Sequence, residues 1–102
     1  MLHSIDSNDV YFMLLHHQYI SELKPNAFTM FPNLISLSIT ESSVKKIEFG
    51  AFKNLKKLST LTLWGNKIDF IGSGAFDDLV SIEQIDLTGS PIDKYVMKVH
   101  PT

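Results

Sequence analysis

At 102 residues the chain has the length of one domain, and its 44% apolar and 20% charged residues are ordinary for a globular protein. The formal net charge is −2 and all 9 cationic residues are lysines, so nothing in the composition favours nucleic acid as a partner. The absence of cysteine excludes disulfides and thiolate metal sites. No apolar run approaches the roughly 20 residues of a membrane helix, so membrane insertion is not expected.

Short strands and return segments alternate along the chain. Residues 1–9 precede the first periodic segment, and Leu2 and Ile5 suggest a rudimentary N-terminal lid. Segments 34–39, 58–63 and 82–87 alternate apolar and polar residues, which is the period of a half-buried strand. Two apolar residues and then, in all but the last unit, a Phe follow each strand, as in Ile68, Ile71 and Phe76, and this spacing suits an irregular or short helical return rather than a second long strand.

The strongest signal is a repeat of 24 residues. Ala-Phe pairs recur at 27–28, 51–52 and 75–76, and apolar columns keep the same register throughout. The columns predict four repeats, at 10–33, 34–57, 58–81 and 82–95, of which the last is incomplete, followed by a C-terminal tail at 96–102. One such unit cannot bury its own apolar edge, whereas stacked units bury a continuous core. The predicted structure is therefore a solenoid with a parallel sheet on one face.

These columns resemble the leucine-rich repeat, LxxLxLxxNxLxxLxxxxFxxL. The best copy runs from Leu58 through Asn66 to Leu79. The resemblance implies an α/β repeat solenoid, with a short parallel sheet on the concave face and irregular or 3-10 turns on the convex face. It also implies a non-catalytic, protein-binding role, and no cofactor.

The length of the unit and its Gly-Ala-Phe step are similar to the "typical" subclass found in extracellular animal proteins. Toll-like receptors, Slit-like proteins and insect leucine-rich immune proteins use such units. The resemblance thus implies an extracellular setting, either a secreted protein or an ectodomain fragment, in recognition or innate immunity.

Two features depart from the family pattern. The asparagine column reads Gln18, Ser42, Asn66 and Ser90, so the turn after each strand is expected to survive with weaker hydrogen bonding. The cysteine-bonded caps of extracellular members are also missing, and the tail offers only Val96, Met97 and Val99 as a second lid.

In this family the concave face carries the residues between the core leucines, and it is the predicted binding surface. Trp64 is expected to face solvent there, either as a binding residue or folded over its neighbours. Phe12 and Leu14 form an apolar patch that suits a ligand, packing against residues 1–9, or self-association. The candidate protein-binding residues are Phe12, Leu14, His16, Glu41, Thr62, Trp64 and Asp86.

Other chemistry finds little support in the sequence. Adjacent His16 and His17 should point to opposite sides of a strand and have no evident third ligand, so no metal site is predicted. The lysines of the second repeat are read as a solvated face. The acids are scattered, and no catalytic spacing or phosphate-binding loop is present, so the chain is not predicted to be an enzyme.

The small area of the predicted concave face favours self-association as an alternative role. Four strands about 4.8 Å apart offer only a few hundred Å², against the roughly 800 Å² that each partner contributes to a standard interface. Open strand edges also recruit other strands. A self-associating fragment or scaffold, forming a homo-oligomer through its exposed ends, is therefore the alternative hypothesis.

Overall fold

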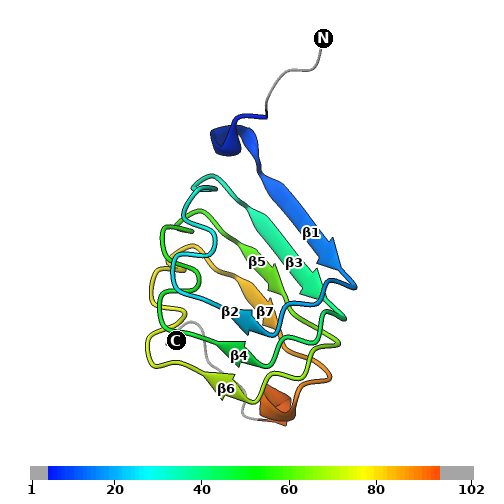
Figure 1. The fold of residues 1–102 in the computed structure, drawn as a ribbon. Helices are drawn as coiled ribbons and strands as arrows, with labels where there is room; N and C mark the ends of the chain where they lie inside the picture. Colours follow the sequence, from blue (N-terminus) through cyan, green and yellow to red (C-terminus); the bar gives the residue numbers. More distant parts are fainter. Residues whose placement is uncertain (1–4, 95–102) are drawn as a thin grey trace.

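The computed structural model describes residues 5–94, whose strands form two parallel sheets (Figure 1). The first sheet has four strands in the order β1-β3-β5-β7, and the second has three in the order β2-β4-β6. The elements are η1 (Ser7–Asp9), β1 (Phe12–His16), β2 (Glu22–Leu23), β3 (Ser36–Thr40), β4 (Lys46–Ile47), β5 (Thr60–Thr62), β6 (Phe70–Ile71), β7 (Gln84–Asp86) and η2 (Pro91–Lys94).

The register of both sheets follows the sequence repeat. Each residue of the four-stranded sheet pairs with the residue 24 positions later, as in Phe12 with Ser36 and Ser36 with Thr60. The three-stranded sheet keeps the same step, from Leu23 to Ile47 to Ile71. Successive strands stack side by side in Figure 1, and the chain crosses from the first sheet to the second in each of the first three repeats, whereas β7 is followed by η2. The predicted solenoid is confirmed.

The return segments differ in one respect from the prediction. They carry the two-residue strands β2, β4 and β6, which the sequence did not indicate, and the described residues contain no α-helix. After β4, however, the N–H groups of Ala51, Lys53 and Leu55 donate to the carbonyls three residues earlier, at 3.1–3.2 Å. Such bonds are of the 3-10 type, so the predicted turns are present beyond these short strands.

The predicted apolar columns form one core between the two sheets. Leu34, Leu58 and Ile82, which open the last three repeats, are almost fully buried. The corresponding Val10 of the first repeat is only partly buried. A repeat is covered by its neighbours, so the middle repeats bury their columns best.

A column of phenylalanines runs through this core. The ring centroids of Phe28 and Phe52 are 6.1 Å apart, and those of Phe52 and Phe76 are 5.8 Å apart. Both pairs are nearly parallel, with interplanar angles of 9° and 11°. Phe52, in the middle, is completely buried. These spacings are those at which stacked aromatic pairs attract each other.

Asn66 supports the turn after β5 with four hydrogen bonds. Its Nδ2 donates to the carbonyls of Ile39 and Leu63 at 2.7 and 2.9 Å, and its Oδ1 accepts from the N–H groups of Ser42 and Val44 at 3.0 and 3.2 Å. The side chain is buried, and all four of its bonding positions are used. It thus ties the second repeat to the third.

In the neighbouring repeats, serine side chains at the corresponding position make some of these hydrogen bonds to the backbone. Ser42 Oγ donates to the Thr40 carbonyl at 2.9 Å and accepts from Gln18 N–H at 3.0 Å. Ser90 Oγ accepts from Ile68 N–H at 3.0 Å. The expectation that these turns survive with fewer bonds is confirmed. Gln18 is exposed, and its Nε2 donates to the nearby His16 carbonyl instead.

The lids predicted at the two ends remain predictions. Ile5 is 82% exposed and η1 follows it, while Leu2 lies outside the described residues. The proposed C-terminal lid of Val96, Met97 and Val99, with the tail at 96–102, also lies outside them.

Candidate functional site

The candidate site is the outer face of the four-stranded sheet, where side chains alternate with the core positions. Strand pairing places Leu14, Ser38, Thr62 and Asp86 in one row across the sheet. Phe12, Ser36, Thr60 and Gln84 form the adjacent row. Because residues two apart on a strand share a face, both rows lie on the side away from the buried leucines.

The β1 side of this face is apolar. Phe12 is 71% exposed and Leu14 is 69% exposed, so the described residues of the N-terminal segment do not cover them. β1 is also the end strand of its sheet, and no described strand pairs with its outer edge. Two large apolar side chains on an open edge strand form an unusual surface for an isolated domain.

The aromatic part of the face lies at the ends of β1, β3 and β5. His16 Nδ1 is 2.8 Å from Thr40 Oγ1, and the His16 and Trp64 ring centroids are 6.3 Å apart. Positions two strands apart are separated by about 10 Å, so the two rings lean toward each other across Thr40. Thr40 is accordingly only 2% exposed, whereas Trp64 keeps 39% of its surface in solvent. Trp64 is thus partly in solvent and 6.3 Å from the His16 ring, and its role in binding stays a prediction.

Beside this cluster, His17 and Glu41 form a second pair. His17 Nε2 is 3.7 Å from Glu41 Oε2, and both side chains are largely exposed. The His16 and His17 rings are 4.0 Å apart, so the expectation that they point to opposite sides is wrong. The reason is that β1 ends at His16, and His17 adopts the left-handed conformation with φ 56°.

The left-handed conformation recurs at this position in every repeat. Glu41 has φ 47°, Gly65 has φ 75° and Gly89 has φ 92°. Glycine adopts such angles freely, whereas His17 and Glu41 do so at a conformational cost. A Cβ on Gly65 would come within 2.7 Å of Glu41 Cγ, so glycine there leaves room for the Glu41 side chain. Residues held against their backbone preference are candidates for function.

The polar part of the face lies on β5 and β7. Thr62 and Asp86 are half-buried, and Asp86 Oδ1 accepts from Thr88 N–H at 2.9 Å. Three strand steps of about 4.8 Å separate Asp86 from Leu14. The seven predicted site residues therefore share one end or face of the sheet but do not converge on a point. They form a broad surface with an apolar side, an aromatic centre and a polar side.

Comparison with known families identifies the repeat. The family model described as leucine rich repeat matches the chain twice, over residues 10–68 and 32–92, which together span most of its length. The chain belongs to the leucine-rich repeat family. A comparison with curated proteins gives no match.

Within this leucine-rich repeat chain, the site has the character of a binding surface. Among residues 5–94, no group of three or more His, Cys, Asp or Glu side chains is placed to hold a metal ion. No helix in the described part of the chain is long and apolar enough to cross a membrane. The family is generally a non-catalytic fold for protein interaction, consistent with the broad, shallow face.

Sequence reasoning missed two contributors to the site. Thr40 reads as an ordinary surface threonine of the repeat, but it is buried and lies within hydrogen-bonding distance of His16. His17 was set aside with the metal hypothesis, although it pairs with Glu41. The 24-residue spacing, which sets Thr40 in line with His16 and Trp64 and sets His17 in line with Glu41, is the signal in the sequence that could have found them.

Proposed function

We propose that this leucine-rich repeat chain binds a protein partner through the outer face of its four-stranded sheet, with the Trp64–His16 cluster at the centre. The observation that carries the proposal is an exposed tryptophan beside the His16 ring, which Thr40 holds by a hydrogen bond, on a sheet of fixed register. Partly exposed, well-supported aromatic residues supply much of the binding energy in protein interfaces. Phe12 and Leu14 extend the contact on the apolar side.

We further propose an extracellular setting, in recognition at the cell surface or in innate immunity. The support is the resemblance of the 24-residue unit, with its Gly-Ala-Phe step, to repeats of secreted and ectodomain proteins. Expression of the natural gene with its own flanking sequence should place the protein in the medium or on the cell surface. Retention in the cytosol would contradict this setting and would leave the binding face unaffected.

Replacement of Trp64 by alanine should remove most partner binding. The substitution would delete the large exposed aromatic side chain at the centre of the face, an effect of about 2 kcal/mol or more, roughly 30-fold in affinity. Quantitative affinity capture from a cognate extract, comparing the parent with Trp64→Ala, measures this loss.

The matched control is Phe70→Ala. Phe70 is a large, exposed aromatic residue like Trp64, with 50% of its surface in solvent. It lies on β6, in the other sheet. A protein that binds the parent and Phe70→Ala, but not Trp64→Ala, has the behaviour expected of the partner. Equal capture by all three forms would remove Trp64 from the site.

The second candidate function, self-association, rests on a different observation. β1 has no described partner on its outer edge and carries Phe12 and Leu14 in solvent. A second copy that aligned its own β1 alongside would pair the free backbone groups and cover both apolar side chains. Such a dimer would also compensate for the small area of a single sheet face.

The double substitution Phe12→Ser, Leu14→Ser should abolish this association. Light scattering with size-exclusion chromatography should give a mass for the parent that rises above 11.5 kDa with concentration, and a constant monomer mass for the variant. Tyr19→Ser is the control, because Tyr19 is 98% exposed and lies outside β1. A parent that stays at the monomer mass throughout would rule the dimer out.

A further inference from the structure

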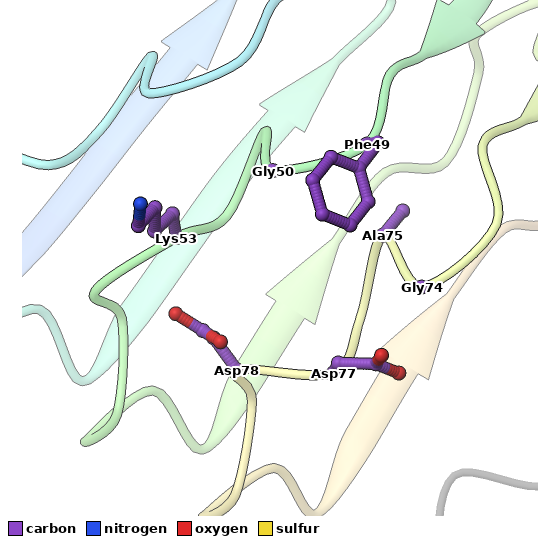
Figure 2. A pocket seen from close by; sticks show the side chains of 7 residues that line it. All are labelled: Phe49, Gly50, Lys53, Gly74, Ala75, Asp77 and Asp78. Carbon is purple, nitrogen blue, oxygen red and sulfur yellow. The ribbon is translucent and has the colours of Figure 1, made fainter.

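A small hollow lies between two successive return segments, away from the four-stranded sheet. It has a volume of about 190 Å³ and lies between the segment that follows β4 and the segment that follows β6 (Figure 2). Its lining consists of Phe49, Gly50, Lys53, Gly74, Ala75, Asp77 and Asp78. None of these residues belongs to the sheet face discussed above, so the hollow is a separate feature.

An aromatic ring and a carboxylate meet at one point of this hollow. An atom placed at the Cβ position of Gly74 would be 3.5 Å from Phe49 Cε1 and 2.9 Å from Asp77 Oδ2. Gly74 has φ 73° and no side chain, and a Cβ there would crowd the Asp77 carboxylate, so glycine lets the ring and the carboxylate lie on either side of the same turn. Figure 2 shows the Phe49 ring above the turn that carries Asp77. Phe49 is 68% exposed and therefore available to a ligand.

The hollow also has an excess of negative charge. Asp77 and Asp78 face a single cation, Lys53, in its lining. Asp78 Oδ2 accepts from Asn54 N–H at 2.9 Å, which holds that carboxylate in place. For the Asp77 carboxylate, no hydrogen-bond or ion-pair partner is found among the side chains and backbone of residues 5–92. Within that part of the chain, Asp77 is an acceptor that no other residue engages, next to an exposed aromatic ring.

We propose that this hollow binds an arginine side chain of a partner protein. A guanidinium group can stack on an aromatic ring and donate to a carboxylate at its edge at the same time, and Phe49 and Asp77 offer these two contacts side by side. Lysine is a weaker match because its ammonium is compact and strongly hydrated. Every cation of this chain is a lysine, so the arginine must come from another protein.

The test is an amide NMR titration of the intact chain with N-acetyl-arginine amide. Saturable shifts are expected at Gly50, Gly74 and Ala75, with a Kd on the order of 30–100 mM, because an exposed cation–π contact and an exposed ion pair together supply only about 1–2 kcal/mol. N-acetyl-lysine amide should bind more weakly, and N-acetyl-norleucine amide should leave these amides unshifted. Absence of saturable shifts at these amides, or equal effects of the arginine and norleucine probes, would overturn the proposal. Lysine binding as tight as arginine binding would overturn the assignment to arginine.

Two substitutions locate the contacts. Phe49→Leu removes the ring and Asp77→Asn removes the charge, and each should weaken arginine binding by about two- to fivefold. Phe70→Leu, at an exposed aromatic on β6, should leave binding unchanged. The same spectra report whether each variant is folded, so loss of binding is separated from loss of structure. Undiminished binding by folded Phe49→Leu and Asp77→Asn would place the arginine elsewhere and contradict the proposal.

Discussion

Phe52→Ala should lower the free energy of unfolding by about 3–5 kcal/mol. Phe52 is fully buried and stacks on Phe28 on one side and Phe76 on the other, so its removal opens a cavity and breaks two aromatic contacts. The free energy of unfolding of such domains is commonly only about 5–15 kcal/mol, so the substitution would remove a large part of it. Urea unfolding followed by circular dichroism measures the difference.

Alanine substitutions of two other phenylalanines provide a comparison for the destabilisation by Phe52→Ala. Phe76 is at one end of the observed stack and only partly buried, so Phe76→Ala should cost less than Phe52→Ala. Phe70 is half exposed on β6, and its replacement by alanine should cost about 1 kcal/mol or less. A cost at Phe52 no greater than the cost at Phe70 would show that the stack does not hold the repeats together.

Asn66→Ala should destabilise the fold by about 3 kcal/mol or more. The substitution leaves the Ile39 and Leu63 carbonyls and the Ser42 and Val44 N–H groups without the partner that now satisfies them, in a buried turn. Each unsatisfied buried group costs about 1–3 kcal/mol, reduced wherever water can enter the space left by the amide. The unfolding midpoint in urea, compared with that of the parent, gives the loss.

Ser42→Ala and Asn66→Asp test whether the lost side-chain hydrogen bonds cause this destabilisation. Ser42 makes two such bonds rather than four, so Ser42→Ala should cost about half as much. Asn66→Asp keeps the size of the side chain but replaces two donors by a buried carboxylate facing two carbonyls, and it should be at least as damaging as Asn66→Ala. If Asn66→Ala costs no more than Ser42→Ala, the asparagine does not have the supporting role assigned to it.

The core and the register follow from the sequence because they depend on a strict repeat. Leu34, Leu58 and Ile82 occupy one column, and stacking units of equal length leaves only one way to bury that column. The serine turns were predictable in the same way, because a hydroxyl supplies part of what the Asn66 amide supplies.

Other features depend on local geometry that the repeat does not encode. A two-residue strand such as β4 is too short to show an alternating pattern, so the second sheet was not predicted. The pairing of His17 with Glu41 depends on left-handed backbone angles at positions where two other repeats have glycine. The hollow at Phe49 arises between loops 24 residues apart, and neither loop contains it alone.

Site-specific photo-cross-linking tests the proposed binding face most directly. A benzophenone amino acid at position 62, in the middle of the sheet face, should cross-link to the partner identified by affinity capture. The same amino acid at position 70, on β6 in the other sheet, should not. A cross-link from position 62 and none from position 70 is expected, whereas a cross-link from position 70 alone would show that the partner does not bind the four-stranded sheet.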